Sequence, residues 1–259
     1  MNKTVRMDRE EEGPTAEEGI FAQLTFDGTA ECDAFVPNPF KKDICRECMS
    51  KITAHTRSAV RREADVKAAI EWLSKRPSVV LARGEVAPSG RDVGGGGGEH
   101  PLGALLLGGF KAAMDARLLK ELSVTHIVNA AVGLGEMWPQ WEAAVARNRE
   151  AGVSILELPW CDTLGQQLEP ADLRRAAAFI AEARAAGGAT LVHCAQGRSR
   201  STVAVVAHLV VAAGGGLSVD DAVAFVQERR IMAQPNPAFM EQLRALEKAA
   251  AFVVPPPAE

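Results

Sequence analysis

The stretch His193–Ser201, HCAQGRSRS, decides what this chain can fold into. It places Cys194 six positions before Arg200, and Gly197 stands between them. Five residues between a cysteine and an arginine can wrap into one turn whose backbone N–H groups point inward. Such a turn, continued into the N-terminus of a helix, binds a phosphate dianion. The spacing therefore predicts a phosphate-binding loop.

The sequence on either side of this loop fits a strand before it and a helix after it. Residues 189–193, ATLVH, are a short apolar run of the kind found in buried strands. Residues 201–213, STVAVVAHLVVAA, are apolar almost all round, which predicts a central buried helix that ends at the glycines 214–216. The alternative is a buried cysteine on a strand beside a solvated Arg-Ser stretch.

The polar residues of the loop suit phosphate chemistry. A free thiol titrates at about pH 8.5, and a helix N-terminus with a nearby cation lowers that value by several units, so Cys194 would be a thiolate at neutral pH. Arg200 can grip two phosphate oxygens at once. Ser201 can donate a hydrogen bond to the thiolate as it leaves. The residues expected to bind phosphate are Ala195, Gln196, Gly197, Arg198, Ser199 and Arg200.

Beyond this loop, three segments make the chain resemble the cysteine-dependent dual-specificity protein phosphatases. Leu105–Gly109, LLLGG, looks like the first strand of that family, and Val124–Ala130, VTHIVNA, looks like the strand that ends in an asparagine. Pro235–Glu247, PNPAFMEQLRALE, looks like the final helix. The resemblance covers residues 101–252 and implies a protein tyrosine phosphatase-like fold.

The same resemblance implies that an aspartate upstream of the nucleophile acts as general acid. Asp162, in PWCDTLG, stands 32 positions before Cys194. Glu157 falls inside the preceding expected strand, and Glu169 and Asp172 fit the first turn of a helix, so they are worse placed. The alternative for Asp162 is a solvated loop aspartate.

Two neighbours of these residues each have two interpretations. His193 orients the loop by hydrogen bonding, or it is an ordinary buried histidine. Cys161, directly before Asp162, is a small buried hydrophobic residue, or it traps Cys194 in a reversible disulfide on oxidation.

The resemblance also implies a mechanism and a substrate class. The thiolate of Cys194 attacks phosphorus while Asp162 protonates the leaving oxygen, and water then hydrolyses the cysteinyl phosphate with the same aspartate as base. This chemistry needs no metal or organic cofactor. The implied substrate is a phosphoprotein with phosphate on tyrosine, serine or threonine. Gln196 and Arg198 would favour a more anionic substrate, such as a multiply phosphorylated peptide or a polyphosphorylated small molecule. The alternatives are an adaptor that binds phosphate without turnover, and a chain whose N-terminal module is the working scaffold.

The overall composition is that of a globular protein. Its 259 residues are 47% hydrophobic and carry a net charge of −4, which gives no reason to expect nucleic acid as a partner. We see neither a signal peptide nor an apolar run long enough to span a membrane. The chain has five cysteines, and we expect a reducing compartment, the cytoplasm or alternatively the nucleus.

Strand-like and helix-like runs alternate after residue 101. This order predicts an α/β fold with a mainly parallel central sheet flanked by helices. The expected strands lie near 104–107, 124–128, 153–158 and 189–193. The expected helices lie near 112–122, 138–151, 171–186, 201–213, 219–229 and 237–251.

The remaining segments have other compositions. We expect a disordered tail at residues 1–20, a small module at 21–60 and a loose, proline-rich tail at 253–259. Residues 61–100 combine a short amphipathic helix, near 61–76, with a linker that contains five consecutive glycines, 94–98. The phosphatase domain is therefore expected to begin at residue 101.

The small N-terminal module carries a possible metal site. Cys32, Cys45, Cys48 and His55 follow the pattern C-x12-C-x2-C-x6-H, and three thiolates with one imidazole are a common tetrahedral set for structural zinc. So short a segment cannot bury a core, so zinc would supply its folding energy. The alternatives are unrelated thiols in a disordered segment, or a redox pair of Cys45 and Cys48.

This module resembles the Cys-rich motif of the myosin phosphatase Rho-interacting proteins. The shared pattern, C-x2-F-x2-N-x-F-x4-C-x2-C-x6-H, includes Phe35, Asn38 and Phe40, and Met49 departs from an aromatic residue common in that group. Residues 36–62 hold seven Lys or Arg against two acids. These charges could steer a cytoskeletal or other acidic partner, or they could simply be a solvated face.

Overall fold

The computed structural model describes most of the chain, in two compact units. The described residues are 28–30, 32, 35–38, 41–46, 48–56, 60, 63–88, 101–131, 133–214 and 216–249. One unit comprises Met1–Ile70, here called the N-terminal unit, and the other Glu71–Glu259, the C-terminal unit. The tails expected at 1–20 and 253–259, and the glycines 94–98, lie outside the described residues.

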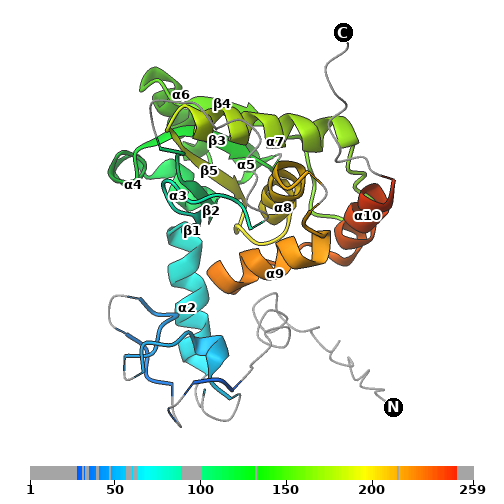
Figure 1. The fold of residues 1–259 in the computed structure, drawn as a ribbon. Helices are drawn as coiled ribbons and strands as arrows, with labels where there is room; N and C mark the ends of the chain where they lie inside the picture. Colours follow the sequence, from blue (N-terminus) through cyan, green and yellow to red (C-terminus); the bar gives the residue numbers. More distant parts are fainter. Residues whose placement is uncertain are drawn as a thin grey trace, which may run out of the picture. The chain divides into compact units, whose positions relative to one another are not determined.

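The C-terminal unit is built on a five-stranded sheet with the order β1-β2-β5-β3-β4 (Figure 1). Strands β2, β5, β3 and β4 run parallel, and β1 pairs with β2 in the antiparallel sense. The expected α/β fold with a mainly parallel sheet is therefore confirmed. The strands are β1 (Ser78–Leu81), β2 (Leu105–Gly109), β3 (Val124–Asn129), β4 (Ser154–Glu157) and β5 (Ala189–Cys194).

Strand β1 lies in a segment for which the sequence predicts only a helix and a linker. Its four residues, SVVL, are too few to show an alternating pattern, and Val79 is 50% exposed at the sheet edge. The pairing of β1 with β2 places residues before 101 in the sheet, and the C-terminal unit begins at Glu71.

The helices connect and cover the strands. The described ones are η1 (Ile52–Ala54), α2 (Glu63–Lys75), α3 (Phe110–Met114), α4 (Ala116–Glu121), α5 (Leu134–Met137), α6 (Gln140–Glu150), α7 (Pro170–Ala185), α8 (Arg200–Ala212), α9 (Val219–Arg229) and α10 (Pro237–Lys248). The single helix expected near 112–122 is two helices, because the chain breaks at Asp115. The Asp115 side chain accepts a hydrogen bond from the Leu118 N–H, 3.0 Å away, and so caps the second of them.

Each face of the sheet packs against its own set of helices. Successive residues of a strand point to opposite faces, so Leu105 and Leu107 pack with α7, α8, α9 and α10, whereas Leu106 packs with α3, α4, α5 and α6. Helix α8 is buried almost all round, as its apolar sequence predicts (Figure 1). Its first residue follows a short loop after β5, so this loop lies at the carboxyl end of a central strand, where ligands bind in open α/β sheets.

In the part of the N-terminal unit that the structure describes, the helices are η1 and the first residues of α2. Two isolated antiparallel bridges join Pro37 to Cys45 and Ile44 to Lys51, and η1 follows them. Phe35 and Ile52 are among its buried side chains.

None of the helices that the structure describes is long and apolar enough to cross a membrane.

We expect α8 to be the main determinant of stability in the C-terminal unit. Leu209 on this helix is fully buried (0% exposed), so Leu209→Ala should lower the free energy of unfolding by about 2–5 kcal/mol through lost burial and a cavity. Urea denaturation followed by circular dichroism measures this. Leu164→Ala is the control, because Leu164 is 70% exposed and should change stability by less than about 0.5 kcal/mol. Equal losses at both positions would contradict the described packing.

Candidate active site

The loop predicted from HCAQGRSRS sits between β5 and α8. Cys194 is the last residue of β5 and is 1% exposed, and Arg200 is the first residue of α8. The Sγ of Cys194 lies 3.2 Å from the Oγ of Ser201, in the first turn of α8. The structure thus brings the predicted nucleophile and the predicted leaving-group donor into contact.

The surroundings of Cys194 favour its thiolate. Burial by itself raises the pKa of this thiol. The hydrogen bond with the Ser201 hydroxyl, the charge of Arg200 and the backbone N–H groups of Ser201 and Arg198 lower it, and together they outweigh burial, so the pKa lies below its ordinary value. This is the effect expected of a thiol at a helix N-terminus beside a cation.

Gly197 lets the loop lie directly against the sheet. Its φ of 71° is in the left-handed region, which glycine adopts without strain. A Cβ at this position would lie 2.3 Å from both the carbonyl carbon and the carbonyl oxygen of Gly108 on β2. No other residue type fits there, so the third position of the loop requires glycine.

Asp162 reaches the same loop from the segment that follows β4. Its Oδ1 accepts hydrogen bonds from the Ser199 hydroxyl at 2.8 Å and from the Asn236 side-chain amide at 3.0 Å. Its Oδ2 lies 3.6 Å from the Nε of Arg200, the separation of an ion pair rather than of a hydrogen bond. The structure therefore places the predicted acid beside the predicted phosphate-binding arginine.

Arg200 is positioned to receive an oxyanion. Its Nη1 donates to the carbonyl oxygen of Trp160 at 3.2 Å, which fixes the guanidinium. Its Nε is buried and has no hydrogen-bond partner among the described residues. A buried N–H of this kind is stabilised when an anion supplies the missing acceptor.

The other predicted loop residues are placed as follows. Ala195 is half-buried and the Gln196 side chain is exposed. The Arg198 guanidinium donates to the side-chain oxygen of Gln234 at 2.8 Å, and the Ser199 hydroxyl is directed to Asp162. The structure thus gives the side chains of Arg198 and Ser199 partners within the protein.

His193 is fully buried, and its Nδ1 donates to the backbone carbonyl of Cys194 at 3.4 Å. Its ring meets that of Trp141 edge to face at 5.2 Å. Burial lowers the pKa of His193 to about 4; the hydrogen bond to Cys194 opposes this and the charge of Arg200 adds to it. The imidazole is therefore neutral at pH 7, and the loop-orienting role remains a prediction.

Cys161 is exposed, so its interpretation as a small buried hydrophobic residue is wrong. It belongs to the loop between β4 and α7, where its backbone N–H donates to the side-chain oxygen of Gln166 at 2.8 Å.

Sequence reasoning missed two residues that support this loop. Asn236 caps α10 through its Oδ1 while its amide holds Asp162. Arg230, directly after α9, donates from Nε to the carbonyl oxygen of Gly197 at 2.7 Å. The Pro-Asn pair at 235–236 was visible as a helix start, but nothing in the sequence around Arg230 indicates that its side chain is buried.

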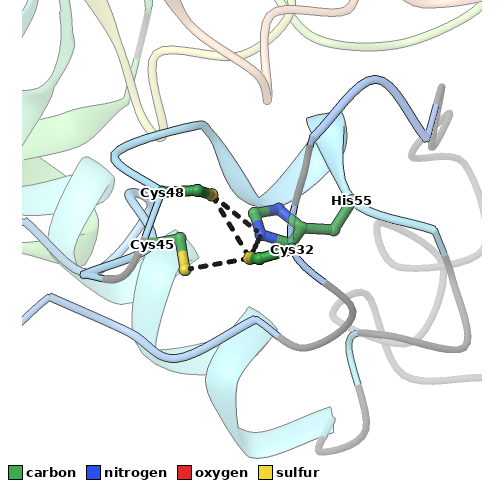
Figure 2. Close-up of side chains that lie close together, drawn as sticks. All are labelled: Cys32, Cys45, Cys48 and His55. Carbon is green, nitrogen blue, oxygen red and sulfur yellow. Dashed lines mark hydrogen bonds between the residues drawn. The ribbon is translucent and has the colours of Figure 1, made fainter.

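A second cluster lies in the N-terminal unit, where Cys32, Cys45, Cys48 and His55 point toward one another (Figure 2). The four possible ligand atoms all lie within 4.8 Å of one another. The Sγ of Cys32 is 3.8 Å from that of Cys45, 3.3 Å from that of Cys48 and 3.1 Å from the Nε2 of His55.

Neighbouring groups orient this cluster. The Nδ1 of His55 donates to the carbonyl oxygen of Lys51 at 2.9 Å, which leaves Nε2 facing the three sulfurs. Phe35 packs edge to face on the His55 ring, at 5.3 Å between centroids, whereas Phe40 lies outside the described residues. Burial raises the pKa of Cys48, but hydrogen bonds from the amide and hydroxyl of Ser50 and from Cys32 and Cys45 together outweigh it and lower the pKa to about 7.

The contact between Cys194 and Ser201 makes a testable prediction. Ser201→Ala removes a hydrogen bond that lowers the pKa of the thiol, so the pH at which Cys194 becomes half-reactive should rise. Iodoacetate alkylation, followed by mass spectrometry of the peptide that contains Cys194, gives this midpoint. Thr202→Ser serves as control, because its hydroxyl donates to the carbonyl oxygen of Arg198 instead. An unchanged midpoint in Ser201→Ala would contradict the hydrogen bond.

Comparison with known proteins gives the same picture. Residues 105–249 match the family described as "Dual specificity phosphatase, catalytic domain". The chain is 34% identical over 154 residues to the mouse protein named dual specificity protein phosphatase 22, which covers 60% of this chain and 76% of that protein. It is also 34% identical over 146 residues to dual specificity protein phosphatase 1 of Arabidopsis thaliana, covering 56% of this chain and 66% of that one.

Solved structures of similar proteins include that of human DUSP28, with 32% identity and a TM-score of 0.48 over 68% of this chain and 95% of that one. The family match begins at residue 105, so the resemblance of the Cys-rich segment to the myosin phosphatase Rho-interacting proteins stays a prediction. The match covers more than half of the chain and includes Cys194, Arg200 and Asp162. The chain therefore belongs to the dual specificity protein phosphatases and is a phosphatase.

Proposed function

We propose that this phosphatase hydrolyses phosphomonoesters of phosphoproteins through a cysteinyl-phosphate intermediate on Cys194. The observation that supports this most directly is the arrangement of Cys194, Ser201, Arg200 and Asp162 around one loop, with the Sγ of Cys194 3.2 Å from the Ser201 hydroxyl. A thiolate, a two-pronged cation and a carboxyl group are the groups that phosphoryl transfer to cysteine requires.

In the first step, the Cys194 thiolate forms a bond to phosphorus while the bond from phosphorus to the substrate oxygen breaks. Asp162, as the carboxylic acid, gives its proton to that oxygen, so the leaving group departs as an alcohol or phenol. Arg200 and the inward backbone N–H groups bind the three equatorial oxygens, whose charge must be stabilised throughout.

In the second step, water forms a bond to phosphorus and the S–P bond breaks. Asp162, now a carboxylate, takes a proton from the water, and the thiolate is restored. Ser201 stabilises this departing thiolate through its hydroxyl. Inorganic phosphate is released, and no step uses a metal or an organic cofactor.

An adaptor that binds phosphate without turnover is not favoured. The predicted nucleophile, arginine and acid are all present: Cys194 contacts Ser201 in the first turn of α8, and Asp162 forms an ion pair with Arg200. A reducing compartment such as the cytoplasm is part of the same proposal, because a thiolate nucleophile requires a reduced cysteine.

The experiment is hydrolysis of p-nitrophenyl phosphate in the presence of EDTA. The wild-type protein should hydrolyse this substrate, and Cys194→Ser should show no activity above background. Asp162→Asn should lower kcat about 10²–10⁴-fold with phenyl phosphate, whose leaving group needs a proton, and less with p-nitrophenyl phosphate, whose leaving group is a stable anion.

Matched substitutions elsewhere serve as controls. Cys161→Ser changes an exposed cysteine, and Asp172→Asn changes an aspartate in the first turn of α7, so both should keep wild-type activity. Turnover that survives Cys194→Ser would exclude the cysteinyl-phosphate mechanism. A folded wild-type protein without any turnover would favour the adaptor.

We also propose that Cys32, Cys45, Cys48 and His55 bind one structural zinc ion. Tetrahedral zinc has Zn–S and Zn–N bonds of about 2.3 and 2.0 Å, which put sulfur atoms about 3.8 Å apart and sulfur about 3.5 Å from nitrogen. The Sγ of Cys32 lies 3.8 and 3.3 Å from the other two sulfurs, and the Nε2 of His55 lies 3.1 and 3.4 Å from the sulfurs of Cys32 and Cys48, which is close to these values. The hydrogen bond of His55 to Lys51 supports this role.

The predicted partner of this module is an acidic protein. Lys41, Lys42, Arg46 and Lys51 carry positive charge within it, which would attract an acidic surface such as that of a cytoskeletal protein.

Zinc binding is tested by metal analysis of the purified full-length chain. We expect one zinc per chain in the wild type and in Cys161→Ser, and none in Cys45→Ser. Removal of the ion with a strong chelator should lower the melting temperature of the N-terminal unit, because zinc supplies its folding energy, while hydrolysis of p-nitrophenyl phosphate continues. A reduced wild-type protein that takes up no zinc would rule out the site.

A further inference from the structure

Arg230 is a fully buried arginine whose side chain is aimed at the back of the catalytic loop. It follows α9 directly and is 0% exposed. Its Nε donates to the carbonyl oxygen of Gly197 at 2.7 Å, and its Nη2 donates to that of Gln196 at 3.1 Å. The two carbonyls thus face away from the nucleophile and toward a buried cation.

The same guanidinium is anchored on its other side. Nη2 also donates to the carbonyl oxygen of Leu73 at 2.9 Å, and Nη1 donates to that of Arg76 at 3.4 Å and to the Ser78 hydroxyl at 3.3 Å. Leu73 belongs to the last turn of α2, where free carbonyls favour a cation. A guanidinium held at five acceptors among the described residues cannot follow the loop if the loop moves, so it acts as a fixed support.

Because each peptide unit is planar, holding a carbonyl of the loop also fixes the direction of the N–H in the same peptide unit. In a trans peptide the C=O and the N–H of the next residue point in opposite directions, and the described residues contain no cis peptide bond. The carbonyl of Gly197 shares its plane with the N–H of Arg198, and that N–H is one of the groups that lower the pKa of the Cys194 thiol. The carbonyl of Gln196 likewise shares its plane with the N–H of Gly197.

The loop has little freedom to relax in another way. Gly197 lies between the Gly108 carbonyl and Arg230, since a Cβ there would be 2.3 Å from the former and 2.8 Å from the Nη2 of the latter. A residue with positive φ and no side chain could rotate its peptide planes readily if nothing held their carbonyls. The hydrogen bonds from Arg230 remove that freedom.

We propose that Arg230 is a positioning residue of the phosphatase reaction, which holds the outward carbonyls of Gln196 and Gly197 so that the amides of Gly197 and Arg198 face Cys194 and the phosphoryl group. Being fully buried, Arg230 touches neither substrate nor nucleophile and acts through the loop. This inference rests on the proposed cysteinyl-phosphate mechanism and adds to it a residue outside the loop.

The experiment compares Arg230→Met with Arg184→Met in the full-length chain. Arg184 is also buried, at 1%, and donates to the backbone carbonyls of Gly103 and Glu85, but it lies in the last turn of α7, at the opposite end of the strands. Loss of either arginine should lower the melting temperature. Only Arg230→Met should lower kcat/KM, by about 10²-fold, weaken inhibition by inorganic phosphate and move the alkylation midpoint of Cys194 to higher pH.

A lysine variant separates geometry from charge. Arg230→Lys keeps the positive charge, but one ammonium group cannot replace the guanidinium fork at both carbonyls. It should therefore retain part of the rate and show a smaller upward shift of the alkylation midpoint. If Arg230→Met does not fold, Arg230→Lys decides the question by the same three measurements.

The pH midpoint of Cys194 alkylation reports on the position of the loop amides, because the charged and titratable groups that face Cys194 are unchanged in these variants. They are Arg200 from α8, His193 from β5 and, through Arg200, Asp162 from the segment after β4. A midpoint and kcat/KM equal to those of the wild type, or an equal shift in Arg184→Met, would overturn the proposal. Wild-type turnover that persists in Cys194→Ser would instead refute the mechanism itself, so the two failures are distinct.

Discussion

A phosphate-binding loop can turn its amides inward only if its carbonyls are satisfied outside. Here each carbonyl from Ala195 to Ser199 has a donor. The Phe110 N–H serves the first, Arg230 serves the next two, the Gln234 N–H and the Thr202 hydroxyl share the fourth, and the Val203 N–H serves the fifth. Buried backbone groups without partners are costly, so this outer shell of donors fixes the inner shell of amides.

The proposed general acid, Asp162, is hydrogen-bonded to the same loop. Asp162 comes from a segment far from the loop in sequence, yet the Ser199 hydroxyl and the Asn236 amide hold it. The N–H of Asn236 also donates to the Ser199 hydroxyl, so the start of α10, the acid and the loop form one hydrogen-bonded set. A displacement of any member would therefore move the proton donor relative to the nucleophile.

The sequence indicates the parts of this site that depend on short spacing. HCAQGRSRS predicts the loop, and apolar runs predict four of the five strands, because buried parallel strands are continuously apolar. The sequence does not predict edge strand β1, because its four residues are partly exposed. The sequence does not predict the role of Arg230 either, because the neighbours of a buried arginine in the sequence do not identify its partners. Its acceptors on α2 and in the catalytic loop lie far away in sequence. The Cys-x2-Cys pair and His55 were recognisable, since a metal set needs only ligand types and spacing.

The anchoring of Arg230 on Leu73, Arg76 and Ser78 has a consequence for where the enzyme begins. Homology alone would cut the catalytic fragment near residue 105, where the family match starts. Such a fragment would lack strand β1 and the carbonyls at the end of α2. It would leave Arg230 buried without three of the acceptors that the structure describes, those of Leu73, Arg76 and Ser78. The smallest catalytic fragment that folds on its own therefore begins upstream of Leu73. The region that the family match covers is shorter than the unit that folds.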